Sequence, residues 1–545
     1  MKKRPYLRLL PLLLAIVLLA GCSSATKPLP EAEDVQGNLI FTIPKLNPDD
    51  FIHIVTMPTI PDPSPEAVST AKETGLENLV YVRSDTVSSD IAPVKYVLIY
   101  NPSVRSSSFL STGNLGSQIK VDLNKGGLEE EDAPSFYDMT VSQDELSGNI
   151  PIEELIKDGS KAGAIITPYK VGDTKTFYCF DSVSLNNPRI TRKFTCKYAG
   201  TNCNIWVSGA KISSKLIKSY GKQFDTYIYQ TVVDTFGPSR FAKNGGKVNL
   251  LYYPMPTGIG GCFTTADLFA LGEVTPSEVA IYGINTDHDI LNLNASLVGV
   301  EGADTFMRST MAHEFQHLIC ATNAYDTPNL TRCPTWFNEA MSGYIEEVLF
   351  PGVKAEKNGH LSDFSKSYLI RNGQSLYNFL TYPDDIGVYG SVYLFSEYLA
   401  NLAGDDIFST FHRYWRTSYS PTLSGAEALA RSLPQKIKIA VDECTGYPAS
   451  ITFNTKEEEI LSKLTLQFYL ELLSKNDSDP KNFSKVKPKK LLYNQTTPAL
   501  IEGGGRIIVA LQGDTFTVPS DADDGLIYVG LDQNFTPIAR IYNMP

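Results

Sequence analysis

Residues 313–317 have the sequence HEFQH, and this short motif carries the residue types of a catalytic metal site. On a helix, side chains four positions apart share a face, so His313 and His317 can bind the same metal ion. Glu314 follows the first histidine and can accept a proton from water at that ion. The residues that flank the motif include no proline or glycine, which is compatible with a helix. The motif therefore predicts a metal site rather than a solvated helix with two incidental histidines.

A third metal ligand is expected on a second helix. A catalytic zinc ion (Zn²⁺) is held by three protein ligands and keeps a fourth position for water. Residues 335–346 follow Pro334 and carry apolar residues at helical spacing, while the intervening 322–330 are rich in loop-forming residues. Folding back would bring Glu339 to the two histidines, although a partly exposed helix acid is the alternative. Glu346 lies on the same face and could accept a hydrogen bond from a ligand imidazole.

The two motifs together resemble the gluzincin metallopeptidases, in which a histidine pair and a downstream glutamate hold zinc. HEFQH followed by WFNEAMSGYIEE is most similar to the hyicolysin-like family of bacterial secreted peptidases within that clan. The second motif is also similar to the WxNE motif of zinc aminopeptidases. However, the gap to the third ligand is longer than theirs, and a GAMEN-type motif is absent from the sequence, which favours an endopeptidase. Thermolysin-like enzymes place a supporting aspartate where Gly343 stands, so the resemblance makes Glu346 its substitute.

The resemblance also implies a Tyr or His that donates a hydrogen bond to the oxyanion of the tetrahedral intermediate. The tyrosine-rich segment 388–399 is similar to the helix that follows the metal site in gluzincins. Tyr389 is our first candidate and Tyr393 the second, and packing of both in the core is the alternative. His360 and His412 are weaker candidates because no motif flanks them.

The amino terminus indicates an exported protein. A basic stretch at residues 2–8 precedes the apolar run 9–20, which is too short for a permanent membrane-spanning helix, so we expect a cleaved signal peptide. The sequence LAGC that ends at Cys22 resembles the lipobox of bacterial lipoproteins, in which this cysteine is lipidated. We therefore expect an extracytoplasmic, lipid-anchored protein of the bacterial cell envelope. Its place would be the outer membrane or the cell surface if the host has two membranes.

Charge and cysteine content narrow the expected partners. A net charge of −12 argues against nucleic acid, which requires a basic surface. The expected partners are protein or peptide substrates and, through Cys22, the membrane. Cys196 and Cys203 flank a turn-like sequence and form the disulfide that we expect in an oxidising compartment. Cys320 and Cys333 bracket the loop between the two zinc helices and could form another.

Composition shifts along the chain predict a multidomain α+β protein. The expected parts are a signal peptide and lipobox (1–22), a linker (23–36), a β-rich, sandwich-like N-terminal domain (37–210), a catalytic domain (211–432), and a C-terminal helix with a small β-rich domain (433–545).

Within the expected catalytic domain, we predict a helix over residues 213–236 and strands over 248–253 and 279–284. Resemblance to gluzincins implies that the last of these strands is the edge on which a substrate lies as an added strand. A further helix is expected over 455–475.

The sequence thus predicts a gluzincin (thermolysin-like) zinc endopeptidase that acts on extracytoplasmic proteins, with Glu314 as the base. Two alternatives stay open. One is a catalytically silent, adhesin-type lipoprotein, against which the intact Glu314 argues because a binding module needs no base. The other is an aminopeptidase.

Overall fold

The structure is a computed structural model of the chain. It describes residues 80–83, 94–104, 108–110, 168–325, 333–355, 373–377, 386–417, 424–474, 492, 499–511 and 525–542, with short gaps at 186–187, 243–244, 257–258, 446 and 448–450. The expected signal peptide, Cys22 and the linker lie outside the described residues and stay predictions. Within the described part, no helix combines the length and the apolar character that a membrane crossing requires.

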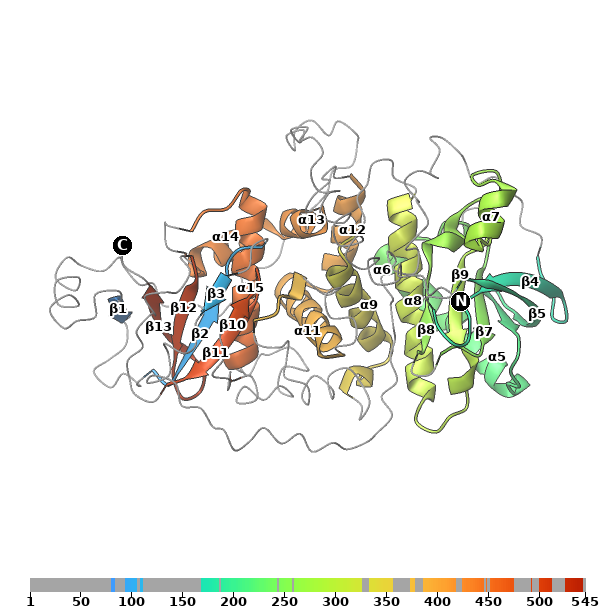
Figure 1. Cartoon of the computed structure of the whole chain (residues 1–545), viewed down its shortest axis with the longest axis horizontal. Coiled ribbons are helices and arrows are strands. Elements are labelled where there is room, and N and C mark those ends of the chain that lie inside the picture. Colours follow the sequence, from blue (N-terminus) through green and yellow to red (C-terminus); the bar gives the residue numbers. More distant parts are fainter. Residues whose placement is uncertain are drawn as a thin grey trace, which may run out of the picture.

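A six-stranded mixed sheet forms one end of the molecule (Figure 1). Its order is β4 (Thr174–Cys179), β5 (Ile190–Ala199), β6 (Cys203–Val207), β7 (Val248–Tyr253), β9 (Ile290–Asn294) and β8 (Gly261–Cys262). The strands β6, β7 and β9 are parallel and buried throughout, whereas β8 runs antiparallel to β9 at the edge. Burial on both faces explains the continuous apolar run of β7. The predicted strand over 248–253 is confirmed.

The predicted helix over 213–236 is also confirmed, with one irregular turn. It consists of α5 (Ser214–Gln223), a π-helical turn η3 (Phe224–Ile228) and α6 (Tyr229–Phe236). Ser213 caps its first turn, and Gly237 ends it with a φ of 103° that favours glycine. Buried side chains recur every three or four positions and pack in the main core: Ile217, Tyr220, Phe224, Ile228, Val232 and Phe236.

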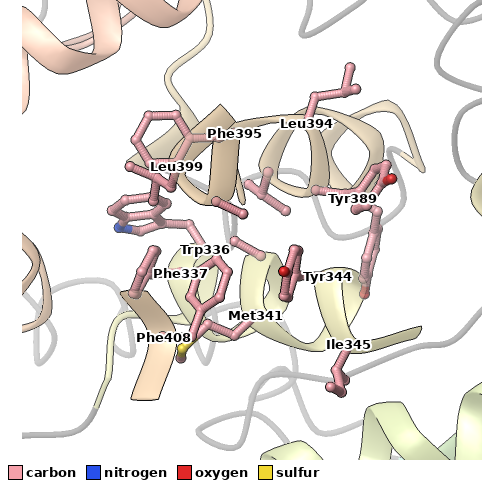
Figure 2. Packing of buried hydrophobic residues seen from close by; sticks show 14 of the residues in the cluster. Trp336, Phe337, Met341, Tyr344, Ile345, Tyr389, Leu394, Phe395, Leu399 and Phe408 are labelled. Carbon is pink, nitrogen blue, oxygen red and sulfur yellow. The ribbon is translucent and has the colours of Figure 1, made fainter. Parts of the chain in front are cut away.

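Three long helices pack one after another between this sheet and the middle of the molecule, and their buried side chains belong to the main hydrophobic core. Helix α8 (Asp304–Tyr325) packs against the sheet, α9 (Thr335–Leu349) packs against α8, and α11 (Ile386–Ala403) packs against α9 (Figure 1). Figure 2 shows the aromatic and aliphatic contact between α9 and α11. There the rings of Trp336 and Phe395 lie 5.7 Å apart. This packing fixes the position of α9 relative to its neighbours.

A second sheet lies at the other end and joins the two ends of the described chain. It is antiparallel, in the order β1 (Val80–Arg83), β13 (Pro537–Tyr542), β12 (Ile527–Leu531), β2 (Tyr96–Tyr100) and β11 (Arg506–Ala510). Helix α15 (Lys456–Ser474) confirms the helix predicted over 455–475. It is linked to this sheet by the Tyr100 hydroxyl, which donates to the Ser462 carbonyl at 2.9 Å.

The remaining described elements are short or connect these layers. They are β3 (Ser108–Leu110) paired with β10 (Ala499–Ile501), helices α7 (Pro276–Tyr282), α12 (Ile407–Thr417), α13 (Ser424–Ser432) and α14 (Gln435–Cys444), and the 3₁₀ turns η5 (Thr265–Leu268), η6 (Ala295–Leu297) and η7 (Val353–Ala355).

The sheets cross the domain boundaries expected from the sequence. Strands β4–β6 fall in the expected 37–210 domain, yet they share a sheet with β7–β9 of the expected 211–432 domain. Strands β1 and β2 pair instead with the C-terminal strands. An antiparallel sandwich confined to 37–210 therefore does not describe these strands. The mixed α+β character of the prediction agrees with the structure.

The predicted strand over 279–284 is wrong. Residues 276–282 form α7, which begins with a reciprocal capping box between Thr275 and Glu278 and has Pro276 at its first position. Gly283, with a φ of 64°, ends the helix in a left-handed conformation. These start and stop signals outweigh the strand propensity of the β-branched and aromatic residues between them.

The expected disulfide between Cys196 and Cys203 does not form, because both cysteines are free. Cys196 lies opposite Trp206 in the β5–β6 pair and packs with it in one cluster. Cys203 belongs to the main core on the other face of the sheet. Side chains on opposite faces cannot approach to bonding distance.

Candidate metal centre

Helix α8 places His313 and His317 side by side. Their ring centroids are 4.6 Å apart with the planes at 89°, and both side chains are buried. The spacing of four residues puts them on one face, as expected from the sequence. This part of α8 is buried between the sheet and α9.

Glu339 of α9 completes a three-residue group. Its Oε2 lies 3.3 Å from His313 Nε2, and its Oε1 lies 3.5 Å from His317 Nε2. One ligand atom from each of the three residues lies within 4.8 Å of the others, so the group could hold a metal ion. The structure therefore brings together the three residues that the sequence predicts as ligands.

The electrostatics of the group favour the metal-binding forms of its members. Burial alone would raise the pKa of Glu339, but the charge of His317 and the close approach of both imidazoles outweigh it and lower the pKa to about 2. Burial lowers the pKa of His317, although the charge of Glu339 opposes this shift. At neutral pH the group thus offers an anionic carboxylate and a neutral imidazole, which are the forms that bind metal.

The donor set fits a zinc ion. Two imidazole nitrogens and one carboxylate oxygen are a known three-ligand combination of catalytic zinc sites. In the described residues, neither oxygen of Glu339 has a hydrogen-bond partner of normal geometry although the side chain is buried. A buried carboxylate without such partners is costly, and a cation at the three ligand atoms would satisfy it.

Glu346 contacts His313 on the side of the imidazole that faces away from Glu339. Its Oε1 accepts a hydrogen bond of 2.7 Å from His313 Nδ1, which leaves Nε2 facing Glu339. The sequence predicts that Glu346 accepts a hydrogen bond from a ligand imidazole, and the structure contains this bond. The Nζ of Lys354 donates to the same oxygen of Glu346. Lys354 was not foreseen, because no motif surrounds it.

Asn338 lies beside the second histidine. It is close enough to the His317 ring to oppose the lowering of the imidazole pKa, and its Oδ1 accepts a hydrogen bond of 3.1 Å from Gln316 Nε2. Sequence reasoning missed this neighbour, although Asn338 stands directly before the expected ligand Glu339. On the side away from the ligand group, His313 Nδ1 bonds Glu346 of α9.

Glu314 lies beside the edge of the six-stranded sheet. Its side chain is buried, and it is close enough to β8 that its charge acts on Cys262. Burial, and after it the charge of Glu314, raises the pKa of the Cys262 thiol. The carboxylate predicted as the base is therefore next to β8, a buried two-residue strand at the edge of the sheet.

The candidate tyrosines lie on α11. Tyr389 is buried among the side chains between α9 and α11 (Figure 2), and its role as an oxyanion donor stays a prediction. Tyr393 packs against Gly343 and donates a 2.9 Å hydrogen bond to Glu397. His412 is hydrogen-bonded to Asn323, which fits a core position. His360 lies outside the described residues.

Two comparisons with known proteins bear on this site. No family model matches the chain. The chain is 29% identical over 272 residues to the neutral metalloprotease ShpI of Staphylococcus hyicus, which covers 47% of this chain and 58% of that protein. The chain thus spans less than two thirds of the length of this relative. The chain is therefore a distant homologue of a metalloprotease, and it contains a buried His-His-Glu group that could hold a metal ion.

Proposed function

We propose that this protein is a zinc-dependent endopeptidase of the gluzincin type that cleaves extracytoplasmic proteins. The single observation that carries the proposal is the buried group of His313, His317 and Glu339, with Glu314 adjacent to it on α8. The distant homology to ShpI supports both the reaction and the protein nature of the substrate. The lipobox-like sequence at Cys22 supports a site of action outside the cytoplasm.

The proposed roles follow from the positions of the side chains. A zinc ion held by the three ligands would supply a Lewis acid that polarises the scissile carbonyl and makes water more acidic. Glu314 accepts the proton of the attacking water and passes it to the leaving amine. Tyr389 is the proposed hydrogen-bond donor to the oxyanion. Glu346 holds the His313 imidazole in orientation through its contact with Nδ1.

We assign substrate binding to β8 in place of the region over 279–284. Strand β8 is the last strand in its sheet and lies beside Glu314. A peptide added as a further strand along this edge would present its backbone carbonyls to the site, with main-chain hydrogen bonds supplying affinity. Such binding needs no free amino terminus, which is consistent with an endopeptidase.

The test compares wild type with Glu314→Gln on an internally quenched peptide library. We expect the variant to retain zinc but to lose about 10²–10⁴-fold in turnover, since the general base is removed without a change in the ligands. The matched control is Glu301→Gln, which changes an exposed glutamate in the turn before α8 and should leave turnover unchanged. His313→Ala should lose the metal as well as the activity.

Wild-type turnover in Glu314→Gln would contradict the proposed mechanism. The two alternatives are separated in the same assay. An aminopeptidase would stop cleaving when the amino termini of the peptides are acetylated, whereas an endopeptidase would not. A silent binding protein would show zinc but no cleavage of any peptide or of denatured protein.

A further inference from the structure

We propose that Lys354 is a positioning residue for metal binding, acting on His313 through Glu346. The proposal rests on the proposed zinc site but concerns a residue that no motif or comparison assigns. Lys354 lies in the 3₁₀ turn η7 that follows α9, eight positions after Glu346. Its Nζ donates to Glu346, which in turn bonds the ligand His313.

The contacts form a chain of three buried side chains. Glu346 Oε1 accepts from His313 Nδ1 at 2.7 Å and also from Lys354 Nζ. The exposed fractions of these side chains are 1%, 2% and 3% for His313, Glu346 and Lys354. Because both donors share one oxygen, the ammonium group fixes where that oxygen stands and therefore how the imidazole is turned.

The backbone around Lys354 is built to hold it in this place. The Glu347 carboxylate accepts hydrogen bonds from the Gly352 amide at 2.6 Å and the Lys354 amide at 3.2 Å. Gly352 has a φ of 94°, which allows the chain to turn back towards α9. The backbone amide and the ammonium group of Lys354 are therefore bound by Glu347 and Glu346, two consecutive residues of α9.

Gly343 of α9 lies beside the lysine stem. A Cβ at position 343 would lie 3.8 Å from Lys354 Cε, which is an ordinary van der Waals distance, and 3.3 Å from Tyr393 Cβ. The stem thus packs at the surface of α9, between the helix and the charged end of Glu346. This route brings the ammonium group to the carboxylate without exposing either to water.

Charge supplies the physical reason for a lysine here. Glu346 and Glu339 are both buried carboxylates on one face of α9, and each approaches an imidazole of the site. Removing a carboxylate from water is costly unless a cation and hydrogen bonds replace the lost hydration. Lys354 provides both to Glu346, so the carboxylate can remain in the orientation that directs His313 Nε2 towards Glu339.

The experiment measures zinc affinity in the absence of substrate. We expect Lys354→Met to weaken zinc binding about 10–100-fold in competition with a chromophoric chelator, as is typical when the support of a ligand histidine is lost. Lys215→Met, which removes an exposed lysine from α5, is the matched control and should change nothing. Lys354→Gln keeps a hydrogen-bond donor without the charge and serves as the second variant if the first is unstable.

A double-mutant cycle with Glu346→Gln separates positioning from a general loss of structure. If Lys354 acts through Glu346, Lys354→Met should have little further effect on zinc affinity in the Glu346→Gln protein. Equal losses in both backgrounds, or unchanged affinity in Lys354→Met and Lys354→Gln, would overturn the proposal. Failure of the wild type itself to bind zinc would instead overturn the proposed function.

Discussion

The ion pair between Arg189 and Asp267 offers a quantitative test of how the protein supports the strand beside Glu314. Asp267 lies in η5, which closely follows β8, and its side chain is 1% exposed. The guanidinium of Arg189 donates to its two carboxylate oxygens at 2.8 and 2.9 Å. The Asn285 side chain donates to Asp267 at 2.8 Å and its backbone amide at 3.2 Å.

Replacing Arg189 by methionine should be strongly destabilising. The substitution leaves the Asp267 carboxylate buried without its cation, and breaking a buried pair in this way costs about 3–5 kcal/mol of unfolding free energy. Because the hydrogen bonds from Asn285 to Asp267 remain, we expect a loss of unfolding free energy near the lower end of this range. The double variant Arg189→Met/Asp267→Asn removes both charges and should recover part of the loss.

An exposed ion pair provides the matched comparison. Arg308 bonds Asp304 at 2.7 Å, but the Asp304 side chain is 54% exposed, so breaking this pair should cost less than about 1 kcal/mol. Urea unfolding of Arg189→Met, Asp304→Asn and the double variant at neutral pH measures the three differences. A cost for Arg189→Met no larger than that for Asp304→Asn would refute the reasoning from burial.

Two further predictions concern the elements around the site. The free thiols of Cys320 and Cys333 are neighbours: burial, and after it the Cys320 thiol, raises the pKa of Cys333, so we expect diamide to link the two. The bond would tie α8 to the start of α9 and add up to about 3 kcal/mol of stability. Mass spectrometry should detect the loss of two hydrogen atoms, and Cys320→Ser is the control. Both thiols remaining free would contradict this. In Gly261→Ala, the new Cβ would lie 2.7 Å from Thr310 Cγ2, so we expect urea unfolding to show a loss of about 1–3 kcal/mol of unfolding free energy. Adding Thr310→Ser, which removes that methyl group, should restore part of the loss. Full stability of Gly261→Ala would count against this close packing.

The ligand group could be predicted because the positions of its residues depend mainly on nearby sequence. His313 and His317 need only a helix to lie together, and the composition around them favours one. Glu339 required one more inference, that the chain turns back between two helices, and the helix start after Pro334 supported it. Lys354 could not be predicted in this way. Its contact with Glu346 depends on how η7 folds back on α9, and a lone lysine in a loop carries no pattern that reveals this.

The sheets were harder to predict than the helices because strand partners are set by long-range packing. Strand β2 pairs with β11 and β12, which lie some four hundred residues later, and nothing in its own sequence names those partners. The pair Cys196 and Cys203 shows the same difficulty at short range. A turn between two cysteines suggests proximity, but the face on which each side chain lies depends on the register and the irregularity between β5 and β6.

The arrangement of charge around the site gives an energetic argument for a cation. Glu314, Glu339 and Glu346 are all buried near the two imidazoles, and each would be costly to bury alone. His313 and Lys354 compensate Glu346, and the imidazoles approach Glu339 only at 3.3 and 3.5 Å. A divalent cation at the three ligand atoms would supply the attraction that these contacts provide only weakly. The stability of the fold should therefore increase when zinc binds, because binding to the folded state alone shifts the unfolding equilibrium.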